Sequence, residues 1–253
     1  MPDLETAVDG AVLVITIARA GQRNAVNRAV ADGIAAAVDR LDGDDRLRAG
    51  VLTGAGGYFC AGMDLKAFAG GERPHVPGRG FGGLVERPPR KPLVAAVEGF
   101  ALAGGMELAL ACDLIVAARG ARFGLPEVRR GLVPAAGGLL RLPARVPRGA
   151  ALELVLTGAP VSSERAYELG LVTRLAEPGA ALEEALALAA AIAANAPLAT
   201  VAAKAILDQA PGWPADDAWA RQRAIADPVI GSHDAKEGAL AFAQKRPAQW
   251  HGR

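Results

Sequence analysis

Hydrophobic and polar residues alternate with different periods along the first third of the chain. Residues 8–19 contain a glycine turn and a β-branched run, which predicts a strand, a turn and a second strand. An apolar stripe with spacings of four and three then predicts a helix that ends in the polar residues 42–45. The stripe consists of Val26, Val30, Ile34, Val38 and Leu41. Residues 50–53 are expected to form the next strand.

The same alternation recurs further along. A strand over 92–97, a turn at Gly99, a helix around 104–111 and a strand over 113–118 are expected, and this order predicts an α/β architecture. Strands then fade. Helices are expected near 150–156 and between Ser162 and Gly170, and the last third is predicted to be nearly all helix.

Two stretches lack a clear period. Residues 67–90 hold six glycines and four prolines and are predicted to be a mobile loop, which either lines a substrate tunnel or makes a disordered surface excursion. Residues 185–203 carry no charge, as a membrane span would, but Asn195-Ala196-Pro197 interrupts them. We therefore expect two helices that meet at Pro197, and no membrane span.

Composition narrows the class of protein. A chain of 253 residues with 51% hydrophobic and 22% charged residues is expected to fold around one main core. The net charge of +1 provides no general attraction to nucleic acid or to an acidic membrane. Cys60 and Cys112 lack zinc or disulfide spacing, and the N-terminus has no basic and apolar leader, so a cytoplasmic location is expected. The three histidines are far apart, and no metal site is expected.

Candidate chemistry centres on Glu107 and Glu127, which both have apolar neighbours. Burial raises the pKa of a carboxyl group toward the range where it exchanges protons, so the pair suits acid and base catalysis. Gly104 and Gly105 precede Glu107 and would let a ligand approach backbone N–H groups at a helix start. Composition alone leaves open a structural role, with Glu107 complementing the helix dipole and Glu127 exposed beside Pro126. A dinucleotide site at 54–57 is not expected, because Phe59 replaces the third glycine of the fingerprint.

A set of motifs extends from Val12 to Arg246. They are Arg19-(x)4-Asn24-Ala25, Phe59-Cys60-Ala61-Gly62-Met63-Asp64-Leu65-Lys66, Val97-Glu98-Gly99-(x)4-Gly104-Gly105-Met106-Glu107-Leu108, Cys112-Asp113, Phe123-Gly124-Leu125-Pro126-Glu127, Leu156-Thr157-Gly158 and Phe242-Ala243-Gln244-Lys245-Arg246. Together they resemble the crotonase family, the enoyl-CoA hydratase/isomerase superfamily. The resemblance implies a spiral of ββα units over residues 1–195. It also implies a helical region over 196–253 that assembles homotrimers, commonly paired into hexamers.

The resemblance also implies roles for single residues. The backbone N–H groups of Met63 and Gly104 would form an oxyanion hole. The coenzyme A moiety would be bordered by Ala61, Met63, Asp64, Leu65 and Lys66, with Arg23 and Ala25 beside them. Phe242 and Lys245 would reach it, often from a neighbouring subunit. Without the motifs, Lys66 and Lys245 would be read as solvated surface charges.

Relatives that hydrate a double bond resemble each other in having two glutamates twenty positions apart, and here 127 − 107 = 20. We therefore predict an enoyl-CoA hydratase of fatty-acid or related acyl-CoA metabolism, which adds water in syn fashion to a 2-enoyl-CoA. Glu107 would deprotonate the water and Glu127 would protonate the α-carbon, without a metal or redox cofactor. The alternatives are an enoyl-CoA isomerase, which needs only Glu127, a carnitinyl-CoA type of dehydratase, and a non-catalytic CoA-binding or RNA-binding relative. Ala103 and Ala135 stand where relatives commonly have glycine, which would change the placement of the water and the shape of the acyl group that fits.

Overall fold

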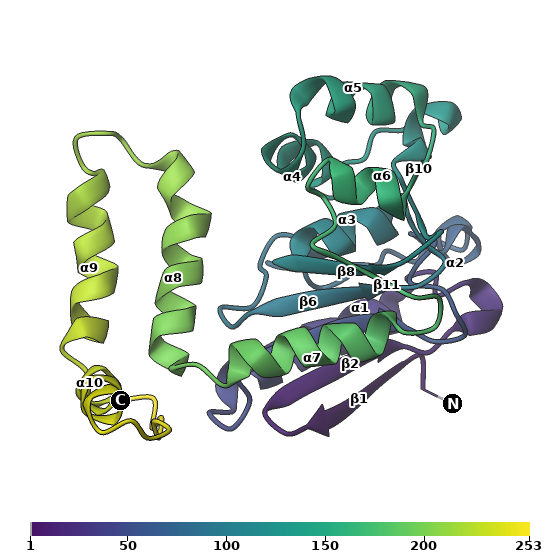
Figure 1. The fold of residues 1–253 in the computed structure, drawn as a ribbon. Coiled ribbons are helices and arrows are strands. Elements are labelled where there is room, and N and C mark those ends of the chain that lie inside the picture. Colours follow the sequence, from purple (N-terminus) through teal and green to yellow (C-terminus); the bar gives the residue numbers. More distant parts are fainter. Residues whose placement is uncertain (1) are drawn as a thin grey trace.

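A computed structural model describes residues 2–253 and shows a six-stranded sheet in the order β1-β2-β3-β6-β8-β11 (Figure 1). The antiparallel β1–β2 hairpin turns at Gly10, whose φ of 56° favours glycine, and every other neighbouring pair is parallel. The strands are β1 (Leu4–Asp9), β2 (Val12–Ile17), β3 (Ala49–Gly54), β6 (Leu93–Val97), β8 (Leu114–Ala118) and β11 (Arg174–Ala176).

A second, three-stranded sheet has the order β10-β9-β7, with β7 (Phe100–Leu102), β9 (Arg122–Gly124) and β10 (Val161–Ser162). The chain moves between the sheets in a regular way. For example, β6 in the large sheet is followed by β7 in the small sheet and then by helix α3 (Gly104–Ala111). The predicted α/β fold with ββα units is therefore confirmed.

The inner strands β2, β3, β6 and β8 are buried on both faces, whereas the edge strand β1 is mostly exposed. Alternate residues of each inner strand point to opposite sides of the sheet. Leu93 and Ala95 of β6 belong to the core that includes α1 (Arg28–Gly43) and α3. Val94 and Ala96 of the same strand instead pack in the cluster that includes α7 (Ala181–Ala193). The sheet is thereby sandwiched between helices, and α3 is held in the interior.

Some boundaries differ from the sequence prediction. Val26 lies outside α1, because the Asn27 side chain caps the helix by accepting a hydrogen bond from the Val30 N–H at 2.9 Å. Val26 instead pairs with Met63 as an isolated bridge. The short strands β9, β10 and β11 were not predicted, since two or three residues are too few to show a period of two.

Residues 67–90 are more ordered than predicted. They follow the start of α2 (Leu65–Ala69) and contain the small hairpin β4 (His75–Val76) and β5 (Gly80–Phe81). Phe81, Leu84 and Val85 are buried and belong to the main core. The prediction of a mobile loop is therefore wrong for residues 79–85, because apolar burial holds them in place.

Helices α4 (Gly138–Arg145), α5 (Arg148–Thr157) and α6 (Ser163–Glu168) form a cap near α3 (Figure 1). Ser162 caps α6 as predicted, since its hydroxyl accepts from the Arg165 N–H at 3.2 Å. The C-terminal arm, defined as α8 (Pro197–Gln209), α9 (Ala218–Ile230) and α10 (His233–Ala243), stands to one side of this body.

The uncharged stretch forms two helices, with α7 ending at Ala193 and α8 starting at Pro197, as predicted. Within residues 2–253, no single helix has the length and apolarity to cross a membrane. Among the described helices, one pair, Ala181–Ala193 and Pro197–Gly212, meets those criteria jointly and is bent by 107°.

Candidate active site

Glu107 lies in the first turn of α3, a helix whose eight residues are all buried. Its side chain is 3% exposed, and Oε1 accepts a hydrogen bond from the Gly138 N–H at 3.0 Å. Burial raises the pKa of Glu107 to about 7, the Gly138 bond opposes the rise, and the nearby negative charge of Glu127 adds to it. A carboxyl group with this pKa can take up or release a proton near neutral pH.

Glu127 lies on the 3-10 helix η2 (Pro126–Arg130), which Pro126 begins directly after β9. Burial raises the pKa of Glu127 as well, while a backbone hydrogen bond and the charge of Arg130 act against the rise. Its Oε2 is buried and has no hydrogen-bond partner among residues 2–253. Buried polar atoms almost always have a partner, so this oxygen is suited to a bound water or substrate.

Gly104 begins α3, so its N–H lacks a partner within the helix. Gly62 passes close to it, because a Cβ on Gly62 would lie 3.0 Å from the Gly104 nitrogen. A Cβ on Gly105 would lie 2.2 Å from the Cys60 carbonyl oxygen. Glycines at these positions therefore let residues 60–63 pack directly against the start of α3.

The backbone bonds of Met63 explain where its N–H points. The bridge to Val26 uses the carbonyl of Gly62, which accepts from the Val26 N–H at 2.8 Å, and the N–H of Asp64, which donates to the Val26 carbonyl at 2.9 Å. The N–H of Met63 therefore points away from Val26, toward the side where β7 leads into α3. This arrangement is compatible with the oxyanion hole that the resemblance implied.

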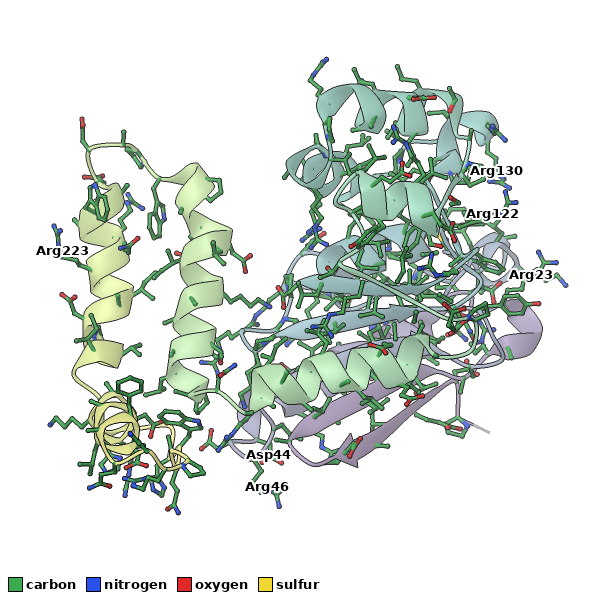
Figure 2. The ribbon with its side chains drawn as sticks, in the orientation of Figure 1. Arg23, Asp44, Arg46, Arg122, Arg130 and Arg223 are labelled. Atoms are coloured by element: carbon green, nitrogen blue, oxygen red, sulfur yellow. The ribbon has the colours of Figure 1, made fainter. Side chains whose placement is uncertain are left out.

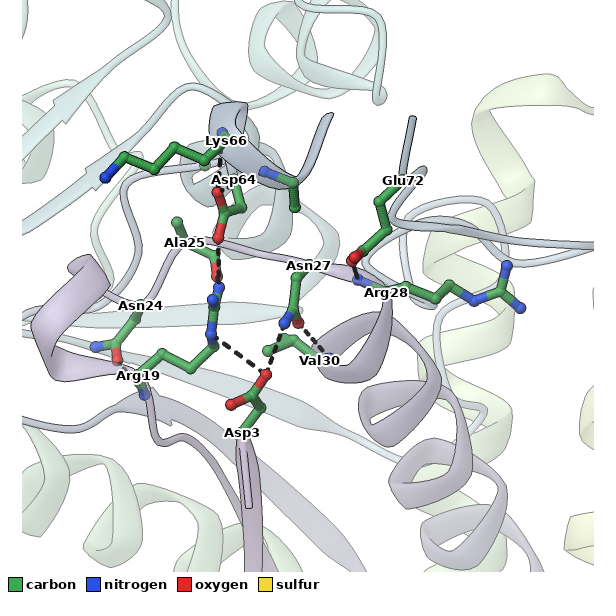
Figure 3. A network of polar contacts seen from close by, with 12 residues as sticks. Asp3, Arg19, Asn24, Ala25, Asn27, Arg28, Val30, Asp64, Lys66 and Glu72 are labelled. Carbon is green, nitrogen blue, oxygen red and sulfur yellow. Dashed lines mark hydrogen bonds and ion pairs between the residues drawn. The ribbon is translucent and has the colours of Figure 1, made fainter. Parts of the chain in front are cut away.

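A polar network fixes the segment that carries Met63 (Figure 3). Arg19 pairs with Asp64 at 3.0 Å and Asp3 at 3.3 Å, and it donates to the Ala25 carbonyl. The Asn24 side chain donates to the carbonyls of Ala55 and Tyr58 at 2.9 and 2.7 Å. The Arg19-(x)4-Asn24-Ala25 motif thus acts as a structural brace.

Asp64 has internal partners rather than a free carboxylate. Besides Arg19, its Oδ1 accepts from the N–H groups of Lys66 and Ala67 at 3.0 and 3.1 Å and so caps α2. These hydrogen bonds and Arg19 lower the pKa of Asp64 against the opposing effect of burial. These contacts position α2, and the place of Asp64 beside coenzyme A stays a prediction.

The other residues predicted to contact coenzyme A fall into two groups. Leu65 and Lys66 are exposed at the start of α2, near the half-buried Ala61, and Arg23 is exposed at the edge of the body (Figure 2). Phe242, which is 88% exposed, lies at the end of α10, and Lys245 follows it. Figure 1 shows α10 at the opposite end of the molecule from α2, so a single chain does not bring these two groups together.

Cavities also lie elsewhere among the described residues. One of about 650 Å³ lies between the arm and the segment that joins α1 to β3, lined by residues such as Arg48, Ala202 and Trp250. Another of about 220 Å³ lies among α4, α5 and α6. Neither is lined by Glu107 or Glu127. The candidate site therefore consists of the carboxylates of Glu107 and Glu127 and the N–H groups of Met63 and Gly104, which can exchange protons and stabilise an oxyanion.

The sequence interpretation did not identify Gly138 or Arg141 as part of this site. Gly138 contacts Glu107 across 31 positions of sequence. The only sequence signal for Gly138 is the run Pro134-Ala135-Ala136-Gly137-Gly138, in which Ala135 replaces a common glycine, and Arg141 lies beyond this run. A Cβ at Gly138 would lie 3.1 Å from the Glu107 Oε1, a tight contact that the Glu107 side chain would have to shift to relieve.

Comparison with known proteins supplies the family. The family described as enoyl-CoA hydratase/isomerase matches residues 7–253. The chain belongs to the enoyl-CoA hydratase/isomerase family. Enoyl-CoA hydratase EchA19 of Mycobacterium tuberculosis is 39% identical, over 100% of this chain and 97% of the relative. Carnitinyl-CoA dehydratase of Escherichia coli K12 is 40% identical, over 97% of each protein.

Solved structures agree with this membership. An enoyl-CoA hydratase from Mycobacterium tuberculosis H37Rv is 58% identical, covers both chains completely and superimposes with a TM-score of 0.99. A carnitinyl-CoA hydratase from Mycobacterium avium is 42% identical over both complete chains, with a TM-score of 0.80. The similarity includes the arm, since the full length is covered in both cases.

Proposed function

We propose that the protein is an enoyl-CoA hydratase that adds water to a 2-enoyl-CoA thioester. The observation that carries the proposal is the pair of glutamates: buried Glu107 is held by Gly138, and half-buried Glu127 has a buried oxygen without a partner among residues 2–253. The pKa values of both carboxyl groups are raised. Family membership and relatives named as hydratases support the same activity.

In the proposed reaction, ionised Glu107 takes a proton from a water molecule while the water oxygen bonds to the β-carbon. Electrons move into the thioester as an enolate, and the N–H groups of Met63 and Gly104 stabilise its oxygen. Each such donor contributes about 3 kcal/mol in comparable sites. Protonated Glu127 then delivers a proton to the α-carbon. No cofactor is required, because coenzyme A is part of the substrate.

For substrate binding, we propose that Arg23, Ala25, Ala61 and Leu65 border coenzyme A and that Lys66 meets its charge. Phe242 and Lys245 would come from a neighbouring subunit, since they lie far from α2 in the same chain. This requires an oligomer, and a homotrimer or a pair of trimers is our proposal. A role in fatty-acid metabolism and a cytoplasmic location stay predictions.

A second candidate is a carnitinyl-CoA type of dehydratase. It is favoured by relatives of that name at 38–40% identity. The same glutamates would work in reverse, with Glu127 removing the α-proton and Glu107 protonating the departing hydroxyl. An isomerase is less favoured because it would leave Glu107 buried and hydrogen-bonded without a chemical role.

The test is the loss of conjugated-enoyl absorbance when the protein meets crotonyl-CoA, with carnitinyl-CoA assayed in parallel. Glu107→Gln and Glu127→Gln proteins should each lose about 10²–10⁴-fold in turnover while still binding the thioester. A fully active Glu107→Gln protein would exclude the assigned base. Turnover of carnitinyl-CoA alone would favour the second candidate.

A further inference from the structure

Arg141 lies on α4, one turn after the glycine that contacts Glu107, and it is half-buried. Its backbone N–H donates to the Gly137 carbonyl at 3.0 Å. That carbonyl belongs to the same peptide unit as the Gly138 N–H, which donates to Glu107 Oε1. One peptide therefore links Arg141 to the carboxylate.

The Arg141 guanidinium is held from two sides. One terminal nitrogen donates to the Val85 carbonyl, within the buried part of the 67–90 segment. The other, Nη1, packs against Gly137, where a Cβ would come within 2.2 Å of it. Gly137 also has φ of 95°, so glycine is favoured there by conformation as well as by space. The guanidinium thus fixes the turn that presents the Gly138 N–H.

We propose that Arg141 is a positioning residue for Glu107: it braces the Gly137–Gly138 peptide against Val85 and provides the positive charge that faces the carboxylate. The inference rests on the proposed function only in that Glu107 acts as the base. It assigns Arg141 no contact with substrate.

The charges around the pair support this assignment. The charge of Glu127 on η2 raises the pKa of Glu107, and the charge of Arg141 on α4 lowers it. Burial and Arg145 on the same helix lower the pKa of Arg141, whereas Cys112 after α3 and Asp208 on α8 raise it. Loss of the Arg141 charge should therefore stabilise the protonated form of Glu107.

Three variants separate the charge from the hydrogen bond. Arg141→Gln keeps a donor for Val85 and removes the charge, whereas Arg141→Lys keeps the charge. Arg145→Gln is the matched control, because Arg145 lies one turn further along α4 and donates to the Cys112 carbonyl. Each variant is less disruptive to folding than truncation to alanine.

The readout is infrared titration of the Glu107 carboxyl, assigned by its absence in Glu107→Gln, which requires no turnover. In Arg141→Gln, the titration midpoint of Glu107 should rise by about half a pH unit or more. In Arg141→Lys, which keeps the charge, the midpoint should lie close to the wild-type value. With crotonyl-CoA, the acid limb of kcat/KM should move equally, giving about a threefold loss on that limb with KM little changed.

An unchanged Glu107 midpoint in Arg141→Gln would overturn the inference, as would an equal change in the Arg145→Gln control. Failure of the proposed function is distinguishable from these results. In that case wild-type protein would leave crotonyl-CoA unchanged, while the infrared titration would still report the effect of Arg141.

Discussion

At the scale of single residues, the burial of Glu107 favours catalysis at the expense of folding stability. Its carboxyl group is 3% exposed and has a pKa of about 7, well above the ordinary value of 4.5. The folded state therefore binds a proton more tightly than the unfolded state between those two values. The stability that Glu107 contributes is fully present below pH 4.5 and is lost as pH rises through 7.

Glu107→Gln should consequently stabilise the protein, and more so at pH 8 than at pH 4.5. The amide has no charge to bury, so we expect a gain of about 1–3 kcal/mol in the free energy of unfolding at pH 8. Urea unfolding at the two pH values measures it. Glu153→Gln on the exposed face of α5 is the control and should change stability by less than about 0.5 kcal/mol. A loss of stability at pH 8 in Glu107→Gln would refute the burial argument.

The sequence made Glu107 and Glu127 visible because each has apolar neighbours along the chain. It did not reveal Gly138 or Arg141, because their relation to Glu107 exists only after folding brings α4 against α3. Asp64 shows the same limit. Its motif predicted a place beside coenzyme A, but its contacts with Arg19 and α2 became apparent only in three dimensions.

At the scale of elements, the start of α3 and residues 60–63 must touch for the two oxyanion donors to lie near each other. Gly105→Ala should force them apart, because the new Cβ would lie 2.2 Å from the Cys60 carbonyl oxygen. Overpacking of this kind typically costs about 1–3 kcal/mol. We expect a lower melting temperature and a lower kcat with crotonyl-CoA.

Gly149→Ala, in α5, is the matched control for that change. A Cβ there would meet nothing within 4 Å, so alanine should stabilise the helix by up to about 1 kcal/mol without changing kcat. Equal melting temperatures and equal kcat values in Gly105→Ala and Gly149→Ala would show that α3 does not pack tightly against residues 60–63.

The strands with clear hydrophobic patterns, β2, β3, β6 and β8, were predictable, and α6 was predictable from Ser162 before it and Gly170 after it. Elements shaped by their neighbours were not. Residues 79–85 looked like a loop because glycine and proline dominate the local sequence, yet Phe81 and Leu84 have places in the core. Val26 fits a helical stripe, but the Asn27 cap excludes it from α1.

At the scale of the whole molecule, the arm carries large apolar side chains on its surface. No residue of α8 or α9 is buried within the described chain, and the exposed residues on the arm include Leu207, Trp219, Ile230 and Phe242. Exposed apolar side chains gathered on one region mark a binding surface. We therefore expect the arm to be covered by further copies of this chain.

Sedimentation of the purified protein should give the mass of a trimer or a hexamer. Trp219→Asp should shift the distribution toward smaller species, because a charge would be buried at the interface. Asp216→Asn, at an exposed position three residues earlier, should leave it unchanged. A monomer at micromolar concentration would contradict this part of the account.

The sequence alone predicted a helical final third, whereas the separation of Phe242 from α2 required the structure.

The central claim is that Glu107 and Glu127 act together on one thioester, and a double variant tests it most directly. Turnover of crotonyl-CoA should be compared in Glu107→Gln, Glu127→Gln and the combined protein, with binding of the thioester measured in each. If the two carboxylates serve one reaction, the double variant should lose little more turnover than the less active single variant. The effects of mutating groups that act as a unit do not add. Losses that multiply, or a double variant that retains wild-type turnover, would contradict the account.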